Sequence, residues 1–576
     1  MNSPRHSLSV LLLYGLLLLI PNVPAQAGSA TWRLNPASSD WNKAGNWTPN
    51  TVPNGSADVA TFGTSNTTAV SILADTEVAQ IIFNPGASAF TISTSGPALT
   101  ISGAGVVNNS GIEQNFAAAL GPGLIQFTNS ATAGDATYTQ TGIGGSGTVT
   151  QFFATSNAGT ATFINQGGSS STGGELFFDS STAANAMFFN HPGIAGGGVT
   201  NFLDNSNAGN ATFICDGGSS SAPIGGFVAF YDDSSAANAS FVANGAETGG
   251  RSFSYVAFYE NSTAANATLT ANGGTAPGAL GAKIYFSYIT GASTAGNADL
   301  IANGGTNGGK GGTIHFEADS LGETARVQIF GNGRLKLNRH NAPGVSVGSI
   351  EGDGTILLGM NNLTVGTNNL DTTFAGKIRK KIGPGSFTKT GNGTLILTNS
   401  NTYTGGTTVA GGTLFVRNTS GSGTGTGQVQ IDRGILGGNG TIAGAVTVGS
   451  RSAKGAFLSP GQAKNKPAVF TLLSTLTFNA NGNYRCDLNS DTASSDEVFA
   501  NGLTINTGSQ FLFADAGATT LTPGIVLIVI NNTAATSITG TFANLPDGST
   551  ITLGSNTFQA NYEGGDGNDL TLTVVP

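Results

Sequence analysis

Two adjacent copies of one pattern occupy residues 174–213, which read GELFFDSSTAANAMFFNHPGIAGGGVTNFLDNSNAGNATF. The second copy repeats the first at a fixed offset, so that Phe177 matches Phe202 and Ala186 matches Ala211. Self-similarity with a fixed period of a few tens of residues is typical of solenoid proteins, in which each repeat forms one coil. The stretch therefore predicts a stack of coils in this part of the chain.

The pattern returns eight times, and each copy can be anchored on an alanine. The anchors follow one another at intervals of about 25 to 31 residues, which is a solenoid period: Ala136, Ala161, Ala186, Ala211, Ala239, Ala267, Ala298 and Ala325. An apolar residue follows two positions after every anchor between polar or β-branched neighbours, which is the alternation of a strand. A phenylalanine precedes the anchor by nine positions in seven copies and predicts a second strand that carries a phenylalanine ladder: Phe127, Phe152, Phe177, Phe202, Phe230, Phe258 and Phe316, with Phe286 displaced by an insertion.

Small and polar residues recur at fixed places between these strands. A glycine stands six positions after the anchor in seven copies, where we expect the chain to turn through a positive φ: Gly142, Gly167, Gly217, Gly245, Gly273, Gly304 and Gly331. Serines precede the anchor by five positions, and asparagines often precede it directly, which indicates stacked turn residues. Insertions fall mainly after the glycine, so one corner of the coil varies in length, although its loops carry few charged residues.

The period is too short for a propeller blade, and the repeats contain no helical stretch. Two or three strands per coil, stacked in parallel on the next coil, are the economical interpretation. The composition agrees, with 87 glycines and only 9% charged residues in 576. We therefore predict an all-β fold, an elongated parallel β-helix (β-solenoid), in which each buried phenylalanine contributes about 1.5 to 3 kcal/mol.

The chain divides into five predicted parts. Residues 1–27 have a basic start, an apolar run over 8–20 and a small-residue end. This pattern predicts a secretory signal peptide and hence an exported protein. An uncleaved membrane anchor is the alternative. The next boundaries are 28–115 for an N-terminal cap and first coils, 116–345 for the repeat array, 346–418 for its continuation and 419–576 for a β-rich end. No later apolar run is long enough to span a membrane as a helix.

All three tryptophans, Trp32, Trp41 and Trp47, lie just after the predicted signal peptide. Large aromatic side chains laid over the first coil would close the core against water and against edge pairing, so we predict an aromatic N-terminal cap. The alternative is a platform of exposed rings that stacks on sugars. The two hypotheses differ in whether the indoles are buried.

Residue types that bind metals or form disulfides are scarce. Cys215 and Cys486 are far apart in the sequence, and the parity of Cys215 places it inside the coil, so a disulfide between them is not expected. The four histidines are scattered without zinc or redox spacing. We predict neither a metal nor another cofactor.

Residues 385–418 read GSFTKTGNGTLILTNSNTYTGGTTVAGGTLFVRN. This stretch closely resembles the autotransporter-associated β-strand repeat, whose FTKTG start, GTLxL strand, NTYTGGTTV and GGTL segments it matches. The resemblance implies a right-handed parallel β-helix at or beyond a bacterial cell surface. Passengers of classical autotransporters precede a C-terminal membrane barrel, and we expect none before Pro576, so the route of export and anchoring stays open.

Charge is distributed in blocks along the chain. Residues 324–466 carry 15 Lys and Arg against 4 Asp and Glu, whereas the segments on either side are acidic. The densest basic point is Lys377, Arg379, Lys380 and Lys381, and we expect residues from 334 to 339 one or two coils away. These four side chains are candidates for contact with a polyanion, namely an anionic polysaccharide or envelope polymer, with nucleic acid less favoured. The alternative is a solvated face whose lysines protect a sheet edge.

An acidic column is expected at four consecutive copies of the repeat: Asp179, Asp204, Asp232 and Glu260. Side chains stacked about 5 Å apart repel one another unless they are solvated or bridged by cations. Turn residues that bind backbone N–H groups are the favoured interpretation, and calcium is the alternative. The segment GGDGNDLTL near Asp566 resembles a calcium-binding nonapeptide, but one copy cannot form a paired site, so we expect a hairpin.

Catalysis on a β-helix needs clustered carboxylates, or a carboxylate with Lys and Arg, on one face. No such cluster is evident, and only a pair from the acidic column could approximate a glycosidase dyad. The sequence therefore favours a secreted or surface-exposed, non-enzymatic structural or adhesive protein. A polysaccharide lyase or hydrolase on the same scaffold is the alternative.

Overall fold

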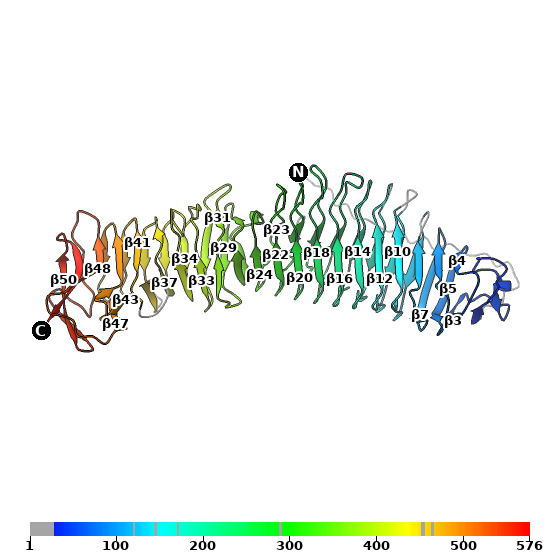
Figure 1. The fold of residues 1–576 in the computed structure, drawn as a ribbon, viewed down its shortest axis with the longest axis horizontal. Coiled ribbons are helices and arrows are strands. Elements are labelled where there is room, and N and C mark those ends of the chain that lie inside the picture. Colours follow the sequence, from blue (N-terminus) through cyan, green and yellow to red (C-terminus); the bar gives the residue numbers. More distant parts are fainter. Residues whose placement is uncertain are drawn as a thin grey trace, which may run out of the picture.

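The chain forms a long rod of stacked coils (Figure 1). The computed structural model describes residues 28–576 except 119–120, 122, 143–146, 170–171, 287–290, 451–454 and 462–465. About 18 parallel turns follow one another along the rod, and the predicted parallel β-solenoid is thereby confirmed. The predicted signal peptide, residues 1–27, lies outside the described residues. No helix within the described ranges is long and apolar enough to cross a membrane.

Four sheets run along the rod. Sheet 1 has 16 strands in the order β2(Trp47–Thr48), β1(Ala30–Trp32), β3(Gly55–Phe62), β5(Thr76–Phe83), β7(Ala98–Asn108), β9(Leu124–Phe127), β11(Val149–Phe152), β13(Gly174–Phe177), β15(Val199–Phe202), β17(Phe227–Phe230), β19(Tyr255–Phe258), β21(Lys283–Phe286), β23(Thr313–Ala318), β25(Arg334–His340), β28(Thr355–Leu357) and β31(Lys377–Arg379). A short 3-10 helix, η1(Ala44–Asn46), precedes β2.

Sheet 2 extends along nearly the whole rod. Its strands are β4(Ala69–Ile72), β6(Thr91–Thr94), β8(Asn115–Ala118), β10(Thr137–Thr141), β12(Thr162–Gln166), β14(Met187–Asn190), β16(Thr212–Cys215), β18(Ser240–Ala243), β20(Thr268–Ala271), β22(Asp299–Ala302), β24(Arg326–Ile329), β27(Ser349–Gly352), β30(Thr372–Phe374), β33(Thr394–Leu397), β35(Thr413–Val416), β37(Gly434–Gly438), β40(Ala456–Pro460), β43(Gly482–Asn489) and β47(Gln510–Asp515). The short strand β44(Ser494–Ser495) pairs with β43.

Two further sheets belong to the C-terminal part. Sheet 3 has eight strands: β26(Gly344–Val347), β29(Asn362–Val365), β32(Ser386–Lys389), β34(Thr407–Val409), β36(Val429–Ile431), β39(Val446–Val448), β42(Leu476–Phe478) and β46(Leu503–Ile505). Sheet 4 has seven: β38(Thr441–Ile442), β41(Val469–Leu472), β45(Glu497–Ala500), β48(Val526–Asn532), β51(Asp569–Val575), β50(Asn556–Gly564) and β49(Thr550–Leu553).

In the repeat array each coil has two strands and one bridged position between them. After β9 the chain makes a single parallel bridge at Thr132, which pairs with Asn157 one coil later, and then enters β10. Equivalent residues of successive copies pair directly, as Phe177 does with Phe202. Because the register joins like with like, each repeated side chain stacks on its own copy.

The core of the array consists of two aromatic ladders. In the first, the phenylalanines of sheet 1 from Phe127 to Phe316 stack with ring centroids 4.5 to 5.0 Å apart. In the second, the rings of sheet 2 from Phe116 to Phe241 stack at 4.6 to 4.9 Å. The ladders meet edge to face, with centroids 5.7 to 6.0 Å apart, a favourable aromatic geometry. The predicted phenylalanine ladder is confirmed.

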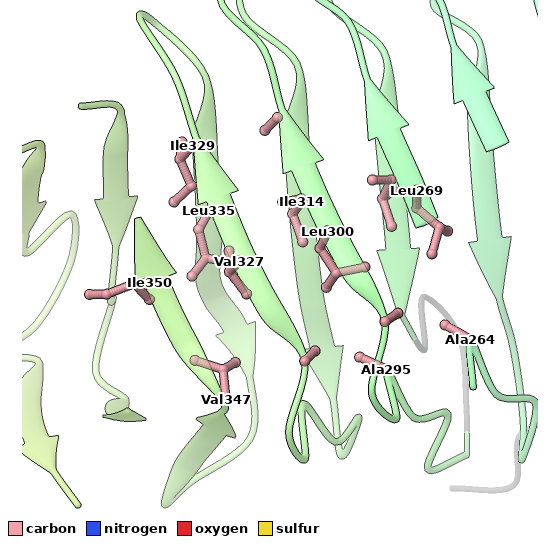
Figure 2. Close-up of a cluster of buried hydrophobic side chains, with 14 of the residues drawn as sticks. Ala264, Leu269, Ala295, Leu300, Ile314, Val327, Ile329, Leu335, Val347 and Ile350 are labelled. Carbon is pink, nitrogen blue, oxygen red and sulfur yellow. The ribbon is translucent and has the colours of Figure 1, made fainter. Parts of the chain in front are cut away.

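Aliphatic side chains replace the rings of sheet 2 in the last coils of the array. Figure 2 shows Leu269, Leu300, Val327 and Ile350 pointing into the coil interior on successive strands of this sheet. All four are buried. The change marks the approach to the C-terminal part, where the core is built from Leu, Ile and Val.

The prediction that the repeated glycines turn through a positive φ is wrong. Of the seven, only Gly331 has a positive φ. Gly167, Gly217, Gly245 and Gly273 are needed because coils approach closely: a Cβ on Gly217 would lie 2.3 Å from the carbonyl oxygen of Gly245. Positive φ occurs instead at the turn residues just after the sheet 1 strands, including Asp179 and Asp204. Asp tolerates this left-handed conformation better than most residues.

Both ends of the rod are closed. Trp32, Trp41 and Trp47 are 2%, 0% and 0% exposed and pack around Phe62, while each indole N–H donates to a backbone carbonyl. The N-terminal cap is confirmed, and the sugar-stacking hypothesis is wrong because the rings are covered. At the other end β49, β50 and β51 form an antiparallel meander, and the GGDGNDLTL segment forms the predicted hairpin between β50 and β51.

Candidate functional site

The basic residues singled out in the sequence lie at the last strand of sheet 1. Lys377 and Arg379 are on β31, Lys380 and Lys381 follow it, and all four are exposed. Sheet 1 ends at this strand, near the first coils of sheet 3. The four cations therefore lie on the last coil to which sheet 1 contributes, two coils after the three-stranded coils begin with β26.

The strand register extends this cluster toward the N-terminus. Lys377 lies in one column of sheet 1 with Arg334, because each of them pairs with Thr355 on the strand between them. Arg379 and Lys336 share the next outward-facing column in the same way, through Leu357. Lys283 lies two strands before Arg334 in the same column, through Thr313. We call the resulting surface the basic face and define it by Lys283, Arg334, Lys336, Arg339, Lys377, Arg379, Lys380 and Lys381.

Sequence reasoning missed Lys283 because this residue belongs to a segment that is acidic as a whole. The signal was nevertheless present, since Lys283 stands three residues before Phe286 as Tyr255 stands before Phe258. Following that offset coil by coil would have placed Lys283 on the outer side of sheet 1. His315 and Glu317 were missed for the same reason.

The edge-protection hypothesis predicts that the lysines guard an open strand. The backbone of Ile378, the central residue of β31, is already satisfied: its N–H donates to Asn401 Oδ1 at 2.7 Å, and its carbonyl accepts from the N–H of Thr402 at 3.0 Å. The loop after β33 thus covers the edge of sheet 1. Repelling a foreign strand does not require four charges there.

Positive charge on the basic face is largely uncompensated. Within the described residues, Arg339 makes the only ion pair of this set, its Nη1 lying 3.7 Å from Glu317 Oε2. Burial lowers the pKa of Lys336 to about 8, and the neighbouring charges of Lys283, Arg334 and Lys381 contribute to the lowering. The three cations that contribute to this lowering show that like charges lie close together on the basic face.

A hollow of about 190 Å³ opens in this face. Its lining residues are Lys283, Tyr285, His315, Glu317, Lys336, Asn338, Arg339 and Lys381. On its floor His315 Nδ1 lies 3.0 Å from Glu317 Oε1, and His315 Nε2 lies 3.0 Å from Thr313 Oγ1. Burial lowers the pKa of His315 to about 4, so the imidazole is neutral at pH 7.

A second hollow of about 380 Å³ adjoins the first. Its lining includes Lys310 and Arg334, and it shares Lys283 and Lys336 with the first hollow. The glycines of the corner after β22, Gly308 to Gly311, form its rim. The corner therefore contributes its glycines and Lys310, while the adjacent strands contribute Lys283, Arg334 and Lys336.

The acidic column acts as a chain of backbone caps. The N–H of Asp179 donates to Asp204 Oδ2 at 3.0 Å, that of Asp204 to Asp232 Oδ2 at 3.1 Å, and that of Asp232 to Glu260 Oε2 at 2.8 Å. Each carboxylate thus satisfies a turn amide of the preceding coil. Groups of three or more His, Cys, Asp or Glu that could hold a metal ion do not occur in the part of the chain that the structure describes.

The C-terminal part contains a close pair of buried carboxyl groups. Burial raises the pKa of Asp496 to about 7, and its Oδ2 accepts from the backbone N–H of Asp487 at 3.0 Å. The two residues are 0% and 2% exposed. Because neither side chain reaches the surface, this pair has a structural role in closing the coil between β43 and β45.

A polar network inside the array also escaped prediction. Glu175 is fully buried on the inner side of β13, the same side as Phe177, and its Oε2 accepts from Asn165 and from Thr200 Oγ1, the latter at 3.1 Å. Asn165 in turn donates to Asn190 Oδ1 at 2.6 Å. Burial raises the pKa of Glu175 to about 8, so its carboxyl group is mostly protonated at pH 7.

Comparisons with known proteins agree with the sequence resemblance. Residues 387–416 match the family described as Passenger-associated-transport-repeat, so the chain contains this repeat, and the predicted resemblance is confirmed. A segment of 107 residues is 37% identical to the "Adhesin BmaC autotransporter" of Brucella suis biovar 1 (strain 1330) and covers 19% of this chain and 3% of that adhesin.

Among solved structures, the chain is similar to the Haemophilus influenzae Hap adhesin. The alignment covers 89% of this chain and 65% of that one, at 10% identity and a TM-score of 0.34. The chain thus spans less than two thirds of the length of either relative.

Proposed function

We propose that this protein is an exported, non-enzymatic adhesive rod of a bacterial surface and that its basic face binds anionic polysaccharide. The passenger-type repeat at 387–416 and the similarity to an autotransporter adhesin support the surface and adhesive parts of the proposal. The basic face supports the ligand.

One observation carries the choice of ligand. Cations from β21, β25 and β31 of sheet 1, and from the segment after β31, gather on one face of a protein whose formal net charge is −9. A long-range field of one sign attracts polymers of the opposite sign. The spacing of the cations along a flat sheet suits an extended chain with charges at intervals.

Anionic polysaccharide is favoured over nucleic acid. The segments on both sides of residues 324–466 are acidic, so a long, densely charged duplex would be repelled beyond the basic face. A polysaccharide with one charge per sugar encounters less repulsion from these segments. Nucleic acid is therefore the competing outcome in the test.

The test is a salt series on columns of polygalacturonate, neutral dextran and double-stranded DNA. The quadruple variant Lys377→Ser, Arg379→Ser, Lys380→Ser and Lys381→Ser is compared with the parent, and Lys43→Ser with Lys466→Ser is the control. We expect the parent and the control to bind polygalacturonate at low salt and elute as salt rises, since exposed charges are screened over about 10 Å at 0.1 M. The quadruple variant should elute near the void volume with an unchanged melting temperature.

Equal retention of parent and quadruple variant at every salt concentration would overturn the proposal. Retention on DNA without retention on polygalacturonate would mean that the ligand is a nucleic acid and not a polysaccharide.

The enzyme alternative rests on the acidic column. Its carboxylates are held by turn amides of neighbouring coils, which favours a structural role. Incubation with a panel of plant and bacterial polysaccharides tests this directly. Release of reducing or unsaturated ends that disappears in Asp179→Asn, Asp204→Asn or Asp232→Asn would make the protein a polysaccharide-active enzyme.

A further inference from the structure

We propose that the hollow beside Lys336 is a defined subsite for one carboxylate or sulfate group of the polysaccharide, and that the adjoining hollow receives the next charged sugar. This inference rests on the proposed function and makes it more specific. A flat basic surface would bind any polyanion by charge density alone, whereas a subsite recognises an individual group.

The first argument is the charge that converges on this hollow. Lys283 comes from β21, Lys336 and Arg339 from β25, and Lys381 from the segment after β31, so four cations from three parts of the chain line one small space. They face a single carboxylate, that of Glu317, and a His315 whose neutral form is favoured at pH 7. The uncompensated charge of the hollow is positive, and one small anion fits its volume of about 190 Å³.

The second argument is preorganisation. The ammonium group of Lys283 lies 3.6 Å from the centre of the Phe253 ring, a cation–π contact that holds its position. Glu317 is hydrogen-bonded to His315 and forms an ion pair with Arg339 at 3.7 Å, which keeps the guanidinium near the rim. Cations that are already in place lose little conformational freedom when an anion binds.

The third argument is the link between the two hollows. Lys283 and Lys336 line both of them, so the two hollows share a pair of lysines. The second hollow adds Lys310 and Arg334. Two adjacent anion positions that share cations match a polymer with a charge on each unit better than a single free anion.

An aromatic ring adjoins the charged groups. Tyr285 lines the first hollow, and its ring is 4.7 Å from that of His315 and 6.3 Å from that of Tyr255. Ring edges beside cations provide an apolar contact for the carbon face of a sugar. The subsite therefore favours a charged sugar over an inorganic anion of equal charge.

The test measures the affinity of the full mature chain for a galacturonate trimer, a sulfated galactose trimer, inorganic sulfate and a neutral galactose trimer at constant ionic strength. Lys336→Met keeps the apolar stem of the side chain and removes its charge, so the coil should fold, which a melting curve verifies. Lys466→Met, an exposed lysine before β41, is the control.

We expect Lys336→Met to bind the charged trimers at least ten-fold more weakly and Lys466→Met to bind them as the parent does. The tighter of the two charged trimers identifies whether carboxylate or sulfate is the natural group. Inorganic sulfate should compete with the trimer more strongly than chloride at equal ionic strength, and the neutral trimer should not bind.

Binding to the subsite and binding to the basic face can fail independently. If polygalacturonate retains the parent but not the quadruple variant, while Lys336→Met binds the trimers as tightly as the parent, the basic face stands and the subsite is wrong. If sulfate competes no better than chloride, binding is by charge density alone and the subsite is likewise overturned. If the parent binds neither trimers nor polymer, both proposals fail.

Discussion

The two halves of the rod hold their cores together in different ways. Residues 124–318 have two strands per coil around stacked aromatic rings, in two ladders as far as Phe241 and in the sheet 1 ladder alone after it, and their sheet 2 strands begin at nearly even intervals. In residues 344–505 three short strands per coil, or two strands and a loop, enclose mostly Leu, Ile and Val. The sheet 3 strands there begin at uneven intervals, as at Val429, Val446 and Leu476. Flat rings stack only if the register is kept, whereas aliphatic side chains repack around coils of unequal length.

The two kinds of coil also differ in what they can present to a ligand. A regular array presents the same side chain at every coil, so its outer columns are ladders of Asp or Asn. The irregular part can place unlike residues side by side. The basic face spans the junction of the two, from Lys283 within the repeat array to Lys381 after the last strand of sheet 1.

The largest expected effect comes from the inner ladder. Phe177 stacks between Phe152 at 4.5 Å and Phe202 at 4.7 Å, so Phe177→Ala should lower the free energy of unfolding by about 3 to 5 kcal/mol. Phe153, which stacks on Phe178 at 4.9 Å but is only half-buried, is the control. Its replacement by Ala should cost less than about 2 kcal/mol.

Denaturant unfolding of the two variants distinguishes an inner from an outer ladder. An equal loss of stability in Phe153→Ala and Phe177→Ala would mean that the core assignment is wrong.

The second effect depends on pH and comes from Glu175 in the array. The pKa of Glu175 is raised to about 8 from the ordinary value of 4.5, so the folded protein binds a proton that the unfolded chain has lost. Stability contributed by this group is present below pH 4.5 and is lost as pH rises toward 8, by about 3 kcal/mol between pH 5 and pH 8. Glu175→Gln should remove that decline.

Melting curves of parent and Glu175→Gln at several pH values check this prediction. The melting temperature of the variant should be closer to that of the parent at pH 5 and should be higher than that of the parent at pH 8. A parent that is equally stable at both pH values would show that Glu175 is ionised in the folded state.

A smaller effect is expected in the acidic column. Asp204→Ala removes the acceptor for the N–H of Asp179 and should cost about 1 kcal/mol. Asp204→Asn keeps an acceptor oxygen and should lower the free energy of unfolding by only about a few tenths of a kcal/mol. Added calcium should leave all three melting temperatures unchanged, and a calcium-dependent rise that Asp204→Asn abolishes would instead establish a cation site.

Much of the array could be predicted from sequence because its periodic residues determine the register. The inner ladders followed from the Phe columns, and the buried tryptophans followed from the need to close the first coil. The reason for the repeated glycines could not be predicted from sequence. The spacing of Gly217 and Gly245 shows that a small residue is required, but not whether a positive φ or a close approach of two coils requires it.

The candidate site was predicted only in part. Lys377, Arg379, Lys380 and Lys381 were evident because they are adjacent in sequence. Lys283 joins them only through strand pairing across the insertion after β20, which pattern matching follows poorly.

Lys389 gives a similar lesson. It lies in the FTKTG motif, yet it is buried at an inward-facing position beside Val365 and Val409, where a lysine is not expected. Strand alternation marks such a position as apolar, so only the structure shows that a charged side chain occupies it.

The most direct test of the account is lysine footprinting of the full chain with and without polygalacturonate, read by mass spectrometry. Acylation reports each lysine separately, so the basic face and lysines on either side of it along the rod are compared in one experiment. We predict that the polymer protects Lys283, Lys336, Lys377, Lys380 and Lys381 and leaves Lys43 and Lys466 unchanged. Equal protection of all lysines, or protection only of Lys43 and Lys466, would contradict a binding site on the basic face.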